Sequence, residues 1–335
     1  MDLAESVLAG NRLALARLLT LVENDTPEGR VALNALFPHT GQAHLIGVTG
    51  SPGTGKSSLV NQLARALRKP EDGSAPRRVA IIAVDPSSPF TGGAILGDRV
   101  RMRDLSGDTG VFIRSMATRG ALGGLARTTA TLSQVFDAAG FDIVLIETVG
   151  AGQSEVDIAR LAHTTLVVEA PGMGDDIQAI KAGILEIADI LVLNKADHAG
   201  VENAERALRS NLEMAQQPRP QNHTRQHTPG SQAAPTQPET PGWVPPILRT
   251  VAPKGQGISA VLEAIQKHAA HLRESGLWQQ REQERLQSEL DLLVQAALVE
   301  RWRATLPAAQ YNSVLRKLNE RSLSPFQALE ILVKP

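Results

Sequence analysis

The 335-residue chain carries 34 basic and 35 acidic residues, a formal net charge of −1, so no general attraction to nucleic acid or anionic membranes is expected. Cysteine is absent, which excludes disulfides, thiolate metal ligands and cysteine nucleophiles. No apolar run approaches the ~20 residues that span a bilayer, and the N-terminus lacks the basic start and apolar core of a secretory signal. These features predict a soluble, cytoplasmic protein.

The N-terminal part of the chain is predicted to be helical. Leucine and valine residues recur at roughly helical spacing over residues 1–40, which predicts a helical extension. An apolar run at 45–48 then leads into a Gly-rich loop, and a helical pattern follows over residues 59–67. This succession predicts a strand, a loop and a helix.

The Gly-rich loop satisfies the pattern G-x-x-x-x-G-K-[ST] of a phosphate-binding P-loop, and its flanking strand and helix argue against an unrelated Gly-rich turn. Backbone N–H groups of such a loop point at phosphate oxygens, and the helix N-terminus adds positive potential. We expect Lys56 to reach the β- and γ-phosphates and the Ser57 hydroxyl to hold Mg²⁺. The expected nucleotide contacts are Gly50, Ser51, Pro52, Gly53, Thr54, Gly55, Lys56, Ser57 and Ser58.

Aliphatic runs over residues 78–84, 142–146, 164–168 and 189–193 are typical of strands buried on both faces. They alternate with amphipathic stretches, which favours a parallel sheet with crossover helices. A last strand is expected at 247–251, before a helix that begins near Ile258. The predicted fold is therefore α/β: a P-loop NTPase with a mostly parallel central sheet flanked by helices, plus helical N- and C-terminal extensions.

Acidic residues lie at the ends of two of these strands and in the loop between them. Asp85 and Glu147 come at strand ends, and the carboxyl edge of a parallel sheet faces the ligand crevice. Asp98 lies in a Gly-rich segment that a γ-phosphate and Mg²⁺ could order. We expect Glu147 to hold Mg²⁺ directly or through water, together with Ser57. Asp85 could instead be a helix cap or turn residue, and Glu147 could be merely solvated.

A second motif follows the strand at 189–193. Asn194, Lys195 and Asp197 satisfy N-K-x-D, and the Asp197 carboxylate can accept hydrogen bonds from guanine N1–H and its exocyclic amine. Adenine lacks this pair of donors, so the motif favours GTP. By itself, such a segment could be a polar turn; after a P-loop and within an alternating strand pattern, it predicts guanine recognition.

Residues 216–242 change abruptly to Gln, Pro, His and Thr, which predicts a disordered, solvated insertion. His223 and His227 have the spacing of a metal pair on a helix, but the surrounding prolines disfavour a helix there. Residues 271–335 are predicted to be helical, with Ser324 and Pro325 opening the last helix. The expected domains are 1–40, 41–270 and 271–335.

Several longer blocks resemble the MeaB/ArgK family, over about residues 5–333. They are the segments 90–102, 115–124, 147–155 and 169–183, together with 243–248 and 268–280. Members of this family are G-protein chaperones of adenosylcobalamin-dependent methylmalonyl-CoA mutase, related to the metallochaperone branch of P-loop GTPases. The resemblance therefore implies a GTPase that guards the loading and integrity of the mutase cofactor.

By position, the resemblance implies Mg²⁺-associated acids at Asp85, Asp98 and Glu147, and catalytic roles for Lys56, Asp98 and Glu147. It implies a mobile coupling segment at 172–183 that carries Gln178 and Lys181, and a homodimer formed through the C-terminal helices. The usual Ser-Ala segment, whose backbone N–H contacts guanine O6, reads Thr250-Val251-Ala252 here. By position, we therefore assign Val251 and Ala252 to the base site.

Three other functions stay open. A metallocentre-assembly GTPase of the nickel-insertion type typically presents Cys and His ligands, but this chain has no Cys and its His cluster lies in the predicted insertion. A transport-associated ATPase or kinase is disfavoured by the base choice of Asp197. A partner that binds nucleotide without turnover uses the same loops. Gln153 is a hypothesis for the residue that positions the attacking water.

Overall fold

A computed structural model of the chain describes residues 2–85, 102–105, 107–117, 124–148, 154–172, 182–216 and 242–333. Residues 1–285 form one compact unit and residues 286–335 a second. The boundaries expected at residues 40 and 270 stay a prediction. Asp98, Gln153, Gln178, Lys181 and the insertion at 217–241 lie outside the described residues.

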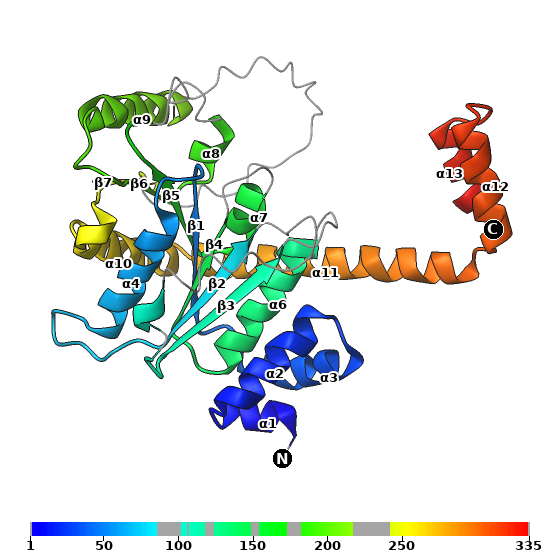
Figure 1. The fold of residues 1–335 in the computed structure, drawn as a ribbon, viewed down its shortest axis with the longest axis horizontal. Coiled ribbons are helices and arrows are strands. Elements are labelled where there is room, and N and C mark those ends of the chain that lie inside the picture. Colours follow the sequence, from blue (N-terminus) through cyan, green and yellow to red (C-terminus); the bar gives the residue numbers. More distant parts are fainter. Residues whose placement is uncertain are drawn as a thin grey trace, which may run out of the picture. The chain divides into compact units, whose positions relative to one another are not determined.

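The first unit is built on a seven-stranded sheet of order β3-β2-β4-β1-β5-β6-β7 (Figure 1). Each neighbouring pair of strands is parallel, and this confirms the predicted α/β class. The strands are β1 (His44–Thr49), β2 (Val79–Asp85), β3 (Val111–Ala117), β4 (Ile143–Glu147), β5 (Thr164–Glu169), β6 (Ile190–Leu193) and β7 (Ile247–Arg249).

Helices cover the sheet and bury its two faces. Side chains of a strand point alternately to opposite faces, so Ile81 and Ile82 of β2 belong to different hydrophobic cores. The helices that follow the strands of the sheet are α4 (Lys56–Arg68), α6 (Gly124–Ala138), α7 (Ser154–Leu161), α8 (Ala182–Glu186), α9 (Val201–Gln216) and α10 (Ile258–Glu274). Short 3₁₀ turns lie at Phe37–His39, Arg103–Leu105 and Ala252–Lys254.

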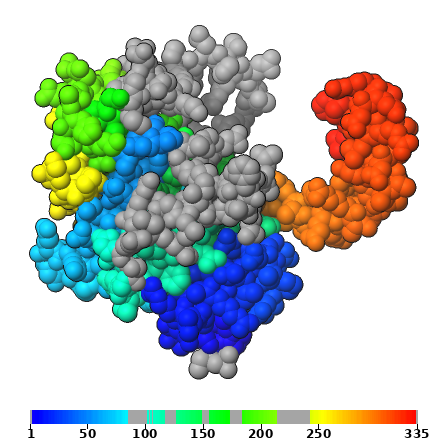
Figure 2. Space-filling view, viewed as in Figure 1, coloured from blue at the N-terminus to red at the C-terminus, as the bar shows by residue number. Residues whose placement is uncertain are grey.

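The predicted N-terminal helices are α1 (Leu3–Leu8), α2 (Arg12–Glu23) and α3 (Pro27–Leu36). Each begins at a capping side chain, Asp2, Asn11 and Thr26 respectively, which accepts a hydrogen bond from an otherwise unpaired backbone N–H. Helices α2 and α3 contact α6 and form one side of the unit, dark blue in Figure 2. Their leucines complete the core on that face of the sheet.

Strand β3 is the one described strand that the sequence patterns do not single out. Its apolar pattern is interrupted in the middle, because Arg114 and Ser115 separate the run 111–113 from Met116 and Ala117. The strand lies at the edge of the sheet, and the Arg114 guanidinium forms an ion pair with Glu23 of α2. A salt-bridged edge strand carries no continuous aliphatic signal.

The second unit consists of helices. Helix α11 (Leu277–Thr305) begins in the first unit and is followed by α12 (Ala308–Asn319) and α13 (Pro325–Val333). As predicted, Ser324 caps α13: its hydroxyl oxygen accepts a hydrogen bond from the Gln327 N–H at 3.2 Å. The Trp302 indole donates to the carbonyl oxygen of Leu332 at 2.8 Å, which ties α11 to α13. No helix among the described residues combines the length and apolar character needed to cross a bilayer.

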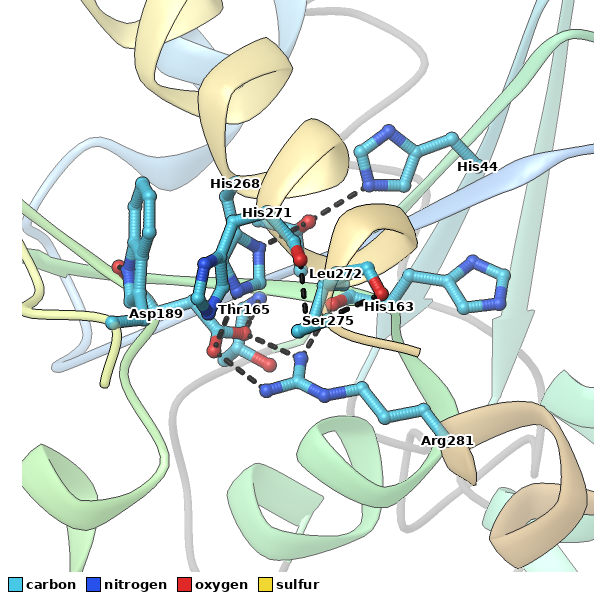
Figure 3. Close-up of polar contacts among 11 residues, drawn as sticks. His44, His163, Thr165, Asp189, His268, His271, Leu272, Ser275 and Arg281 are labelled. Atoms are coloured by element: carbon cyan, nitrogen blue, oxygen red, sulfur yellow. Dashed lines mark hydrogen bonds and ion pairs between the residues drawn. The ribbon is translucent and has the colours of Figure 1, made fainter. Parts of the chain in front are cut away.

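A buried carboxylate fixes the first turns of α11 at the edge of the sheet where β6 begins (Figure 3). Arg281 of α11 donates to both carboxylate oxygens of Asp189, at 2.9 and 3.0 Å. The Thr165 N–H donates to the same carboxylate at 2.8 Å, and Nε2 of His268 lies 3.2 Å from it. Burial raises the pKa of Asp189, but hydrogen bonds from His268 and Arg281 outweigh it and lower the pKa to about 2.

Two further histidines lie at this edge. Nε2 of His44 is 2.7 Å from the Thr164 hydroxyl, which lies 2.9 Å from Nδ1 of His268. His163 stacks on Trp278 of α11 with ring centroids 4.0 Å apart. Burial holds the pKa of His44 well below its ordinary value and also lowers that of His163. The His44 ring is therefore neutral at physiological pH and serves as a hydrogen-bonding group.

Candidate nucleotide-binding site

The P-loop leaves the carboxyl end of β1 and closes at the first turn of α4. Gly50 and Gly55 have φ angles of 130° and 93°, in the region that favours glycine. A Cβ atom on Gly50 would lie 2.0 Å from the carbonyl oxygen of Val168, and one on Gly55 would lie 2.4 Å from Nδ2 of Asn194. Both positions therefore require glycine, since backbone and a buried amide occupy the space.

The Lys56 side chain folds back over the loop. Its Nζ atom donates to the carbonyl oxygens of Gly50, at 2.7 Å, and Ser51, at 3.0 Å. The side chain is only 6% exposed, so the charge is held within the hollow of the P-loop. An ammonium group in this position can donate hydrogen bonds to phosphate oxygens that bind in the loop.

Ser57 and Glu147 meet at the end of β4. The Ser57 hydroxyl donates to Oε1 of Glu147 at 2.6 Å, and both side chains are buried. A hydroxyl and a carboxylate, both oxygen donors, are the ligand types that Mg²⁺ accepts, so these residues fit the expected metal. Asp85 ends β2, two strands from the P-loop strand.

Asn194 joins the two predicted motifs. Its Nδ2 atom donates to the carbonyl oxygen of Thr54 in the P-loop at 2.8 Å. Its Oδ1 atom accepts hydrogen bonds from the Thr250 hydroxyl and the Ala252 N–H, both at 3.0 Å. One buried amide therefore holds the P-loop and the Thr250–Ala252 segment together. The Val251 N–H donates to the carbonyl oxygen of Gln256 at 3.1 Å.

Asp197 lies on the turn after β6, where Lys195 has a positive φ angle of 56°. Nζ of Lys254 contacts Oδ2 of Asp197 at 2.8 Å. This hydrogen bond is the main cause that holds the pKa of Asp197 below its ordinary value, so the group is an acceptor throughout the physiological range. Lys254, in the 3₁₀ turn after β7, has no counterpart in the sequence prediction.

Glu169 is a further buried carboxyl group at this edge that the sequence analysis did not assign to the site. It ends β5, and its Oε1 atom lies 3.5 Å from the Ser51 hydroxyl. The signal was available, because the rule that selected Asp85 and Glu147, an acid at the carboxyl end of a buried strand, applies equally to Glu169.

A parallel sheet, a P-loop between β1 and α4, and an N-K-x-D turn after β6 define a P-loop GTPase. The model of the family described as methylmalonyl Co-A mutase-associated GTPase MeaB matches residues 15–306. The chain belongs to this family, as the sequence resemblance predicted.

Relatives support the same conclusion. A protein from Pyrococcus abyssi is 40% identical over 333 residues, which cover 99% of this chain and 95% of that protein. The GTPase ArgK of Escherichia coli is 35% identical and covers 97% of this chain and 96% of its own length. The mitochondrial methylmalonic aciduria type A homolog of Caenorhabditis elegans is 37% identical over 58% of this chain and 51% of that protein.

The fold also matches a solved structure. The crystal structure of a LAO/AO transport system kinase superposes with a TM-score of 0.69 and is 27% identical. The match covers 99% of this chain and 95% of that chain. The likeness therefore extends over the whole fold.

Replacing Asp197 with asparagine is expected to weaken GTP binding by about one to two orders of magnitude, the range for loss of a charge-assisted hydrogen bond. The amide can still accept one hydrogen bond but presents a donor to the second guanine donor, so xanthosine nucleotides should gain affinity relative to GTP. Competition binding with GTP, ATP and xanthosine triphosphate measures both changes. Equal affinity of the unaltered protein for ATP and GTP would contradict the guanine assignment.

Proposed function

We propose that this GTPase is a chaperone of an adenosylcobalamin-dependent methylmalonyl-CoA mutase, in which GTP binding and hydrolysis guard the loading and integrity of the mutase cofactor. The observation that carries the proposal is the match to the mutase-associated GTPase family over residues 15–306. The Caenorhabditis elegans relative, whose name refers to methylmalonic aciduria, supports the same partner.

In the proposed site, the phosphates lie in the P-loop and the guanine lies between Asp197 and the Thr250–Ala252 segment. The P-loop amides and Lys56 stabilise the charge that develops on the transferred phosphoryl group. Ser57 and Glu147, with Asp85 and Asp98, would hold Mg²⁺. The bound ion would neutralise negative charge on the β- and γ-phosphates. The hydrogen bond between Ser57 and Glu147 holds two of these oxygen donors together.

A homodimer formed through the C-terminal helices is part of the proposal. Within the second unit, large apolar side chains are exposed on α11 and on α13, including Leu290, Leu298, Phe326 and Leu329, each more than half exposed. Exposed apolar surface of this kind marks an interaction site. A second copy of the chain fits it because the family resemblance implies this arrangement.

The test of the proposal is GTP turnover with and without a purified adenosylcobalamin-dependent methylmalonyl-CoA mutase. We expect the mutase to stimulate hydrolysis. We also expect Lys181→Ala to reduce this stimulation while leaving nucleotide affinity unchanged, since Lys181 lies outside both nucleotide motifs. If the mutase stimulated Lys181→Ala by the same factor as the unaltered protein, Lys181 would have no role in the coupling. If no cobalamin-dependent mutase stimulates the unaltered protein, the chaperone function itself is wrong.

A further inference from the structure

Glu169 is packed against the first turn of the P-loop. The preceding residue, Val168, touches the loop so closely that a Cβ atom on Gly50 would lie 2.0 Å from its carbonyl oxygen. The Glu169 side chain is 8% exposed, and its Oε1 atom lies 3.5 Å from the Ser51 hydroxyl. On the other side, the Asn194 N–H donates to the Glu169 carbonyl oxygen at 2.8 Å. The backbone of Glu169 is therefore fixed between the two nucleotide motifs.

Within the described part of the chain, the charged groups that act on this carboxyl group are Lys56 from α4 and Glu155 from α7. The Lys56 ammonium is directed to the carbonyl oxygens of Gly50 and Ser51, and the charge of Glu155 opposes ionisation of Glu169. Among the described residues, no cationic side chain forms an ion pair with Glu169. Burial is the main cause that raises the pKa of Glu169, to about 7, against the smaller effects of Ser51 and Lys56.

A nucleotide in the P-loop changes the balance around Glu169. Even with Mg²⁺ neutralising part of their charge, its phosphates bring net negative charge into a site where the carboxyl group is already poorly solvated, and like charges disfavour ionisation. The same phosphates attract the Lys56 ammonium, which weakens its influence on Glu169. Both effects favour the neutral carboxylic acid when nucleotide is bound.

We propose that Glu169 takes up one proton from solvent when a guanine nucleotide fills the P-loop, so that nucleotide affinity depends on pH through this side chain. The inference rests on the proposed nucleotide site and adds a residue to it. The proton binds to a carboxylate oxygen of Glu169, and no other bond forms or breaks. Below neutral pH Glu169 is already protonated in the free protein, so nucleotide binding takes up few protons. Above neutral pH the Glu169 carboxylate is ionised and must be protonated when the nucleotide binds.

The test is calorimetry of Mg·GDP binding in pairs of buffers that differ in ionisation enthalpy, because proton uptake appears as a buffer-dependent heat. The unaltered protein should take up about half a proton at pH 7 and approach one proton at pH 8, as follows from the pKa of the free protein. Its affinity for GDP should fall by up to about tenfold between pH 6 and pH 8.

Glu169→Gln, a neutral side chain of the same shape, is the deciding variant. We expect it to take up no proton at this position and to lose the pH dependence relative to the unaltered protein. Protons that belong to the nucleotide itself are common to both proteins and cancel in the difference. The matched control is Asp157→Asn on α7, because burial also raises the pKa of Asp157. This control should keep the full proton uptake.

The outcomes separate this inference from the proposed function. Equal proton uptake by the unaltered protein and Glu169→Gln would overturn the inference and leave the nucleotide site intact. Loss of proton uptake in Asp157→Asn would show that Glu169 alone does not account for the proton, and this result would overturn the inference as well. Failure of the unaltered protein to bind GDP would contradict the proposed site instead. If Glu169→Gln does not fold, absence of proton uptake by the unaltered protein at pH 8 is sufficient to reject the inference.

Discussion

Replacing Asp189 with alanine is expected to lower the free energy of unfolding by about 3–5 kcal/mol, the range for removal of one partner from a buried ion pair. The substitution would leave Arg281 of α11 and the Thr165 N–H without the carboxylate that now accepts their hydrogen bonds. Urea unfolding followed by circular dichroism measures the loss.

The matched control is Asp104→Ala, which removes a surface carboxylate 3.6 Å from Arg65. Exposed pairs contribute little, so we expect a change within about 1 kcal/mol. If the two variants lost similar amounts of unfolding free energy, the contacts of Asp189 with Arg281 and the Thr165 N–H would not stabilise the protein as a buried ion pair does.

Asp189 also makes the free energy of unfolding depend on pH in the acidic range. The pKa of Asp189 is lowered from 3.8 to about 2 in the folded chain, so its stabilising effect is complete above a pH of about 4. The effect is lost as the pH falls toward 2 and amounts to roughly 2 kcal/mol. The unaltered protein should therefore lose more stability between pH 4 and pH 2 than Asp189→Ala does.

Lys56→Met is expected to lower the rate of GTP hydrolysis by about 10²–10³, the typical cost of removing one preorganised group that stabilises developing charge. Methionine keeps most of the apolar stem in its buried position and removes only the ammonium that now contacts the Gly50 and Ser51 carbonyls. Single-turnover release of phosphate from bound GTP measures the chemical step.

Lys69→Met provides the matched control at the other end of α4, where the side chain is exposed. We expect it to leave the rate unchanged, because a charge at the C-terminal end of this helix lies away from the P-loop. A loss as large as that of Lys56→Met would mean that the general positive charge of α4, and not the P-loop ammonium, supports hydrolysis.

Much of the sheet could be predicted because its central strands are buried on both faces. Strands β2, β4, β5 and β6 are rich in aliphatic residues, and the sequence predicts each of them to within about one residue at its ends. The P-loop was equally clear, since its glycines are required by close backbone contacts such as that of Gly50 with Val168.

Other features depend on residues that are distant in the sequence. Asp189, Arg281 and His268 come from a turn and two different helices, and no local pattern announces that they meet. Lys254 becomes notable only because the chain returns it to Asp197. Such pairs are created by tertiary packing, which spacing and composition do not encode.

The position of Asn194 has a consequence for how the ligand's two ends are sensed. Its amide is hydrogen-bonded at once to the P-loop and to the Thr250–Ala252 segment, so neither can shift without disturbing the other. Guanosine and pyrophosphate, offered as separate fragments, should therefore help each other to bind. The binding free energy of GDP should be more favourable than the summed binding free energies of guanosine and pyrophosphate, by more than their covalent linkage alone contributes. In Asn194→Ala this additional binding free energy should be absent.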